Sequence, residues 1–131
     1  MLDTNTVSYY IRGHKAVERR LESLPMASLC ISAITAGELF FGLEKQPAAT
    51  RLRYGVFEFL RRIDVYDWDL ATAERYGAVR ADLRRQGKAL GLHDLQIAAH
   101  ALRLGAILVT SDTAFQHVAE LRIEDWTANR E

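Results

Sequence analysis

The sequence is poor in residues that stabilise a fold from outside its core. It holds one cysteine, Cys30, inside the apolar run "SLCIS", and only two prolines. A lone thiol cannot form an internal disulfide, and in such a run it is typical of a buried structural cysteine. With 131 residues of which 49% are hydrophobic, the chain is large enough to fold around its own core. We expect one domain spanning residues 1–131, in a reducing, cytoplasmic setting.

The chain also lacks net charge and long apolar runs. Its 17 basic and 17 acidic residues cancel, so it has none of the overall positive field that marks many nucleic-acid-binding proteins. Any contact with nucleic acid must therefore rely on local basic clusters such as "RRQGK" at 84–88. No apolar stretch is long enough for a signal peptide or a membrane span, so we expect no membrane contact.

Several catalytic motifs are missing as well. There is no G-x-S-x-G nucleophile motif, and the four histidines show no H-E-x-x-H spacing, which argues against serine hydrolase and zinc protease chemistry. His100, inside "IAAHA", is expected to be a core or supporting residue.

Short apolar runs alternate with segments of helical period along the chain. Strand candidates are the stub "ML" and residues 27–32, 63–67, 106–110 and, more weakly, 122–125; the helical segments lie near 5–12, 14–23, 33–45, 48–61, 69–86 and 93–104. Continuous apolar strands separated by helices are typical of a parallel sheet covered on both faces. The pattern predicts an α/β sandwich.

Four acids stand out because no lysine or arginine is interleaved in their local motifs: Asp3, Glu38, Asp94 and Asp112. Singly, each has an ordinary explanation. Asp3, Asp94 and Asp112 suit helix caps or turns, and Glu38 could pair with a distant cation.

Taken together, the four acids are expected to meet. Asp3 and Asp112 follow predicted strands, and ligands of parallel sheets bind beyond the carboxyl ends of the strands. Asp94 begins a helix that starts at that edge. Glu38 lies about 9 Å down another such helix at ~1.5 Å per residue, with its side chain pointing back towards the edge.

Carboxylates gathered at one site repel one another unless a cation joins them. Oxygen ligands suit Mg²⁺ or Mn²⁺ rather than zinc. Such a site activates water and neutralises charge on a phosphodiester. The four acids therefore indicate metal-dependent phosphodiester hydrolysis.

Four blocks of the sequence, taken in order, resemble a known family: "LDTNT", "SAITAGELFFG", "HDLQIAAHALRLGAILVTSDTAF" and "LRIEDW". Together they are similar to the PIN-domain ribonucleases, in particular the VapC toxins of bacterial toxin-antitoxin pairs. The resemblance implies a PIN-like three-layer sandwich with a parallel sheet of four to five strands flanked by helices on both faces. It also implies a cytoplasmic Mg²⁺- or Mn²⁺-dependent endoribonuclease that forms a homodimer and is held inactive, in a larger assembly, by a VapB-type antitoxin.

Carried over residue by residue, Asp3, Glu38 and Asp94 match the three core acids of the family and Asp112 its more variable fourth. The resemblance implies that Asp3 and Asp94 are the principal metal ligands, while Glu38 and Asp112 hold water or a second ion. Thr4, Asn5 and Thr110 fall in the same motifs as supporting residues.

The sequence departs from the family in two places. Only Met1 and Leu2 precede Asp3, which shortens the first strand, and His93 stands where Asn is frequent before the third acid. His93 is a candidate substrate contact, as are Arg84 and Arg85, whose planar guanidinium groups suit phosphate; solvated surface positions are the alternative for all three.

The segment "GELFFGLEKQPAATRLRYGVFEFL" is rich in Phe and Tyr. We expect part of it to form the dimer or antitoxin contact, with core packing as the alternative.

Two other functions stay open on the sequence alone. Asp3 after a strand could be the nucleophile of an aspartyl-phosphate phosphatase or receiver-like domain, although Asn5 replaces a second Asp and no lysine follows Lys88. The chain could also be a non-catalytic module that keeps the fold and acts only through protein contacts.

Overall fold

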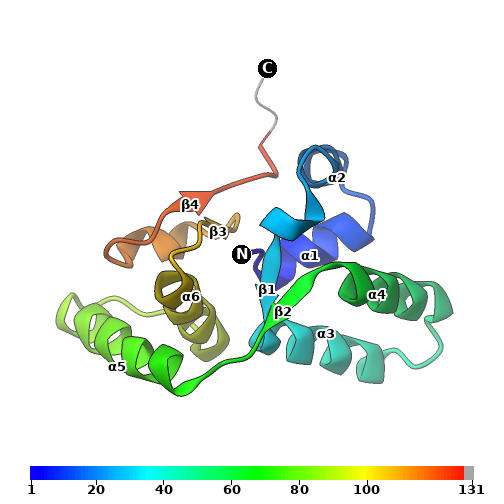
Figure 1. Ribbon diagram of the computed structural model, residues 1–131. Helices are drawn as coiled ribbons and strands as arrows, with labels where there is room; N and C mark the ends of the chain where they lie inside the picture. The colour runs from blue at the N-terminus through cyan, green and yellow to red at the C-terminus, as the bar shows by residue number, and fades with distance from the viewer. Residues whose placement is uncertain (129–131) are drawn as a thin grey trace.

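Six α-helices form at the segments where the apolar residues follow a helical period. The computed structural model describes residues 1–128. Its helices are α1 (Thr4–Ile11), α2 (Lys15–Glu22), α3 (Ala33–Lys45), α4 (Thr50–Arg62), α5 (Leu70–Arg85) and α6 (Leu92–Leu104), with 3-10 turns η1 (Met26–Ser28) and η2 (Thr113–His117) (Figure 1). Each α-helix ends within two residues of its expected limits, so the helical part of the prediction is confirmed.

The strands are shorter than expected. They are β1 (Cys30–Ser32), β2 (Asp64–Tyr66), β3 (Leu108–Val109) and β4 (Ile123–Glu124). β1 pairs in parallel with β2, and β3 with β4, which gives two two-stranded sheets in place of one sheet of four to five strands. Leu2 adds an isolated parallel bridge to Val109. The parallel α/β architecture is confirmed, with less regular pairing than the resemblance implies.

Residues 1–3 lie between the two strand pairs and bond to both. The amide of Leu2 donates to the carbonyl oxygen of Cys30 at 2.9 Å, and the amide of Asp3 donates to that of Val109 at 3.1 Å. The amide of Val109 in turn donates to the Met1 carbonyl oxygen at 2.8 Å. The extended N-terminal segment stops at Asp3, because Asp3 is already the N-cap of α1. Its shortness explains why the central pairing amounts to a single bridge.

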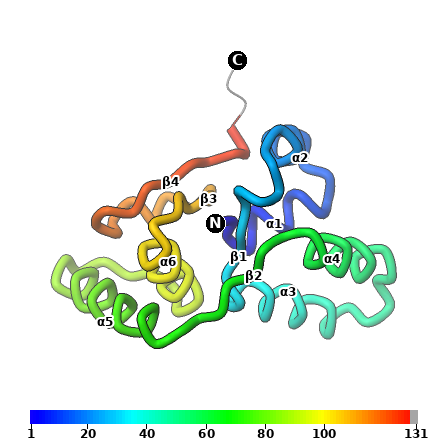
Figure 2. Tube along the Cα trace, in the orientation of Figure 1, coloured from blue at the N-terminus to red at the C-terminus, as the bar shows by residue number. Residues whose placement is uncertain are grey.

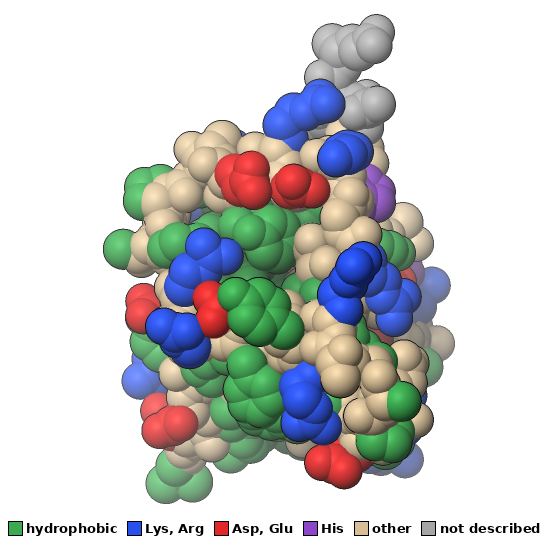
Figure 3. Space-filling model, turned by 90° about the vertical axis from the view of Figure 1, so that its right-hand side faces the viewer, with side chains coloured by type: hydrophobic (Ala, Val, Ile, Leu, Met, Phe, Trp, Pro, Cys, Tyr) green, Lys and Arg blue, Asp and Glu red, His purple; other side chains and the backbone are tan. Residues whose placement is uncertain are grey.

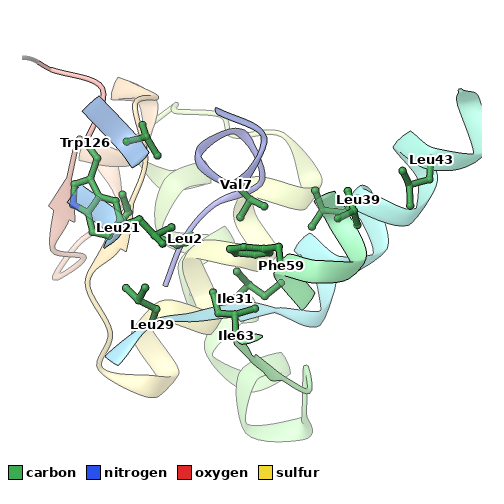
Figure 4. Packing of buried hydrophobic residues seen from close by; sticks show 13 residues of the cluster. Leu2, Val7, Leu21, Leu29, Ile31, Leu39, Leu43, Phe59, Ile63 and Trp126 are labelled. Atoms are coloured by element: carbon green, nitrogen blue, oxygen red, sulfur yellow. The ribbon is translucent and has the colours of Figure 1, made fainter. Parts of the chain in front are cut away.

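Successive residues of the central segments point into two different cores. Leu2, Ile31 and Val109 belong to one cluster of buried hydrophobic residues, whereas their neighbours Met1 and Leu108 belong to another. This is the alternation of side chains across a strand. Figure 4 shows the first cluster, in which Leu2 and Ile31 lie near Phe59.

The helices cover the strands from two sides, as the two cores require. Figures 1 and 2 show α5 and α6 on one side of β1 and β2, and α1 to α4 on the other. None of the helices within residues 1–128 combines the length and apolar character needed to cross a bilayer.

The central position of Leu2 generates a prediction about stability. Leu2 is 0% exposed, and truncating a buried leucine leaves a cavity, so Leu2→Ala is expected to lower the free energy of unfolding by about 2 to 5 kcal/mol. The measurement is urea denaturation followed by circular dichroism.

Leu70→Ala is the matched control, because Leu70 is 86% exposed and its truncation should change the unfolding free energy by less than about 0.5 kcal/mol. Equal effects of the two substitutions would contradict a central role for the segment 1–3.

Candidate active site

Asp3 stands where the N-terminal segment turns into α1. Its side chain caps the helix by accepting a hydrogen bond from the amide of Thr6 at 2.8 Å. The residue is only 4% exposed. A buried carboxylate at a helix N-terminus is stabilised by the free amides and the helix dipole. The cap thus fixes Asp3 at the edge where the central strands end.

Glu38 lies in the second turn of α3 and receives contacts from two other helices. The Thr4 hydroxyl of α1 donates to its Oε1 at 2.8 Å. Its Oε2 lies 3.3 Å from Nδ1 of His93, in the first turn of α6. The Glu38 side chain is 28% exposed, and that of His93 60%. Glu38 therefore finds partners that its own helix does not provide.

Asp94, on the first turn of α6, is the electrostatic centre of the site. Burial raises the pKa of its carboxyl group above the usual 3.8, and the negative charges of Asp112, Asp3 and Glu38 raise it further, while His93 opposes them. The acids that act on Asp94 electrostatically are thus the three other acids predicted from the sequence. We call Asp3, Glu38, Asp94 and Asp112 the carboxylate cluster.

Asp112 is the exposed member of the carboxylate cluster. Its side chain caps η2 by accepting from the amide of Ala114 at 2.9 Å. Its own amide donates to the hydroxyl of Thr110 at 3.0 Å, and Thr110 is 1% exposed. The turn after β3 therefore holds Asp112 at the rim.

The other sequence candidates separate into two groups. Thr4 and Thr110 each bond to a member of the carboxylate cluster, at its side chain or its backbone. Asn5 is exposed on α1 beside Thr4. Arg84 and Arg85 are exposed at the far end of α5 and are not part of the cluster.

Sequence reasoning missed Thr35 and the partner of His100. Thr35 is fully buried, with its hydroxyl 3.3 Å from that of Thr4; it lies three residues before Glu38, on the same helix face, which was a readable signal. Ser32 and His100 bond at 2.8 Å between Oγ and Nδ1. That pair joins α6 to the start of α3 from residues 68 positions apart, so no local pattern could reveal it. His100 is 1% exposed, which confirms its place in the core.

The donor chemistry of the carboxylate cluster fits a hard divalent cation. Within residues 1–128, no three His, Cys, Asp or Glu side chains are close enough to enclose a metal ion as they stand. Mg²⁺ commonly takes only one or two carboxylates and keeps several waters. The raised pKa of Asp94 shows that the carboxylates repel one another, and a cation would relieve that repulsion.

Fold and site together define an α/β protein with a carboxylate cluster at one edge, and the comparisons with known proteins agree. The family model for the PIN domain matches residues 1–121. A Shigella flexneri protein named tRNA(fMet)-specific endonuclease VapC is 41% identical over 128 residues, which cover 97% of each chain. Ribonuclease VapC2 of Haemophilus influenzae is 38% identical over 132 residues, or 96% of each chain.

Solved structures give the same result. DNA-bound VapBC from Salmonella typhimurium contains a chain that superposes with a TM-score of 0.89 at 38% identity, covering 96% of both chains. VapBC2 from Rickettsia felis, bound to a DNA fragment from its promoter, gives a TM-score of 0.89 at 32% identity and covers 96% of this chain and 97% of the other. The chain therefore belongs to the PIN-domain family and, within it, to the VapC ribonucleases.

The raised pKa of Asp94 predicts how stability depends on pH. A carboxyl group with a higher pKa in the folded state costs stability once it ionises, so the unfolding free energy falls as pH rises from 3.8 through the raised value. Asp94→Asn is expected to raise the urea midpoint at pH 7 in metal-free buffer. This gain should shrink as the pH approaches 4.

Asp69→Asn is the control of opposite sign. Hydrogen bonds from the side chain and amide of Thr72 lower the pKa of Asp69, so its ionised form is favoured in the folded state and its replacement should not stabilise the protein at pH 7. A loss of stability in Asp94→Asn would contradict the repulsion within the carboxylate cluster.

Proposed function

We propose that this VapC-type chain hydrolyses RNA phosphodiester bonds at the carboxylate cluster with Mg²⁺ or Mn²⁺. The observation that carries the proposal is the meeting of four acids from distant parts of the chain: burial raises the pKa of Asp94, and the charges of Asp112, Asp3 and Glu38 raise it further. Carboxylates gathered in this way are stable together only with a cation or a proton, and family membership favours the cation.

Each acid receives a role from its surroundings. Asp3 and Asp94, the more buried aspartates of the four acids, are the proposed principal metal ligands. Asp112, which is exposed, and Glu38, which already contacts Thr4 and His93, are proposed to orient water or hold a second ion. The bound cation would activate water and neutralise charge on the phosphodiester. Thr4 keeps Glu38 in place through its hydroxyl.

We propose initiator tRNA as the substrate, by extension from relatives. The proteins named tRNA(fMet)-specific endonuclease VapC from Shigella flexneri and Salmonella typhimurium are 41% and 39% identical to this chain. We also propose that the chain acts in the cytoplasm. Mapping RNA 5′ ends after induction of the protein would show whether that tRNA or another RNA is cut.

Substitutions at Asp3 and Asp94 test the proposed ligands. Asp94→Asn and Asp3→Asn keep the size of each side chain and remove its charge, and both are expected to reduce Mg²⁺-dependent cleavage of initiator tRNA by at least about a hundredfold. Asp3→Asn retains an oxygen to cap α1, whereas Asp3→Ala loses cap and charge together. Cleavage rates and urea midpoints of the two Asp3 variants therefore separate catalysis from capping.

Metal titration provides the control for this experiment. Mg²⁺ or Mn²⁺ at about 100 times its dissociation constant should stabilise the unsubstituted protein by about 2.7 kcal/mol, and the stabilisation should be lost in Asp94→Asn. Full cleavage by Asp94→Asn would refute the assignment. A protein that shows neither metal stabilisation nor cleavage of any RNA would instead be the non-catalytic module.

We also propose a VapB-type antitoxin as partner, bound in a hollow beside the carboxylate cluster. The hollow has a volume of about 370 Å³ and runs from Glu38 and His93 to apolar side chains of α1, α3 and α4. Phe41, at its wall, is 62% exposed. Figure 3 shows hydrophobic side chains among Lys and Arg on the face that includes α3 and α4. Support for this partner comes from the VapBC complexes of relatives.

The antitoxin contact is tested by removing Phe41. Phe41→Ser should weaken binding of the cognate antitoxin roughly tenfold, or ~1.4 kcal/mol, as measured by isothermal titration calorimetry. Tyr54→Ser is the matched control, because Tyr54 is 70% exposed on α4 and is not part of the hollow.

We also propose that the protein forms a homodimer. Analytical ultracentrifugation of the free protein measures its oligomeric state directly. A monomer that also fails to bind antitoxin would contradict both proposed partners.

A further inference from the structure

RNA binding at the carboxylate cluster faces an electrostatic obstacle. The cluster carries four acids, and the chain as a whole has a net charge of +0. Without these four acids the rest of the chain has 17 basic and 13 acidic residues, an excess of four positive charges (17 − 13). An RNA strand is therefore repelled at the cluster and attracted only where those cations gather. Affinity must come from cations placed locally beside the site.

A basic groove lies between the end of α5 and the start of α6. Its volume is about 210 Å³. Three cations and three leucines line it, together with Ala89: Arg80, Arg84, Lys88, Leu83, Leu90 and Leu95. We call it the α5–α6 groove. Its lining contains no acid.

The cations of the α5–α6 groove have no acidic partner within residues 1–128, because none of the ion pairs there involves Arg80, Arg84 or Lys88. Arg80 donates one hydrogen bond, from Nη1 to the Tyr76 hydroxyl at 3.0 Å, which leaves its charge uncompensated. Arg85, one residue further along α5, differs: it pairs with Asp82 at 3.7 Å and does not line the groove. Arg84 and Arg85 are adjacent in the sequence, but only Arg84 lines the groove and only Arg85 is paired with an acid.

The α5–α6 groove lies next to the carboxylate cluster along the chain. Leu90 and Leu95, two of its walls, flank the turn that carries Asp94. Within that turn, a Cβ built on Gly91 would lie 3.6 Å from Oδ2 of Asp94. Gly91, next to the wall residue Leu90, thus lies beside the Asp94 carboxylate, and the groove and the cluster share the loop that leads into α6.

We propose that Arg80, Arg84 and Lys88 bind phosphates of the RNA strand on one side of the scissile bond. Arg80 and Arg84 are four residues apart on one helix face, about 6 Å along the axis, and present the forked donors that suit phosphate. Lys88 lies beyond the end of α5 and lines the same groove. The proposal rests on the proposed ribonuclease function and adds the place where the substrate backbone is held. Arg85 has no part in it.

The test measures the salt dependence of RNA binding. Labelled initiator tRNA is titrated by fluorescence anisotropy at increasing KCl and constant Mg²⁺, with every variant in an Asp94→Asn background that prevents cleavage. Arg84→Ala should weaken binding about tenfold at low salt and reduce the slope of log K against log salt by about 0.7 to 1. Arg84→Lys, which keeps the charge, should retain most of the slope.

Two matched variants make the experiment specific. Arg85→Ala removes the same charge from the adjacent residue, and Arg61→Ala removes an exposed arginine paired with Glu58 on α4; neither should change the slope. Equal slopes for Arg84→Ala and Arg85→Ala would overturn the proposal. So would a loss of antitoxin binding without a loss of RNA binding in Arg84→Ala, because the groove would then be a protein contact.

Cleavage of the same tRNA by the protein without substitutions is measured in parallel. If that protein cleaves the tRNA while Arg84→Ala and Arg85→Ala have equal slopes, the proposed role of the groove is refuted and the ribonuclease function stands. If that protein cleaves no RNA, the ribonuclease function itself is refuted.

Discussion

The backbone hydrogen bonds of residues 1–3 are the constraint on which the rest of the structure depends. They tie the N-terminal segment to β1 through Cys30 and to β3 through Val109. Without them the two strand pairs would share no backbone contact of this kind, and the two hydrophobic cores on either side would lose the layer that separates them. The same segment ends at Asp3, so the interaction that joins the fold also sets the position of one catalytic candidate.

The candidate site shows how ordinary structural roles and chemistry coincide. Asp3 and Asp112 both cap helical turns, and Asp94 occupies a first turn where an acid is favoured. Asp3 and Asp112 accept hydrogen bonds from backbone amides, which offsets part of the repulsion between the acids. Local caps do not remove that repulsion, as the raised pKa of Asp94 shows. The protein thus keeps an unfavourable charge arrangement at the edge where its strands end.

Two cavities near the carboxylate cluster differ in their chemistry and therefore suit different ligands. One cavity is a hollow that combines apolar side chains, the exposed Phe41 and two cations, Arg12 and Lys45; the other is a groove with three cations and no acid. The exposed phenylalanine and apolar side chains of the hollow favour a protein segment, and the basic groove favours a phosphate backbone. A neutral chain can therefore serve two kinds of partner, because its charges are unevenly placed.

Sequence alone determined the local features of this protein. Helix limits followed from apolar period and caps, and the four acids were found because no cation lies near them in the chain. The resemblance of four sequence blocks gave the family. Strand pairing was overestimated, since an apolar run shows that a segment is buried but not how many of its residues find a partner strand.

What only the tertiary structure decided involves residues far apart in the chain. The contact of Thr4 and His93 with Glu38, the bond between Ser32 and His100, and the separation of Arg84 from Arg85 all depend on how helices pack. A sequence pattern fixes which face of a helix is apolar, whereas distances between polar side chains on different elements arise only when those faces are buried together.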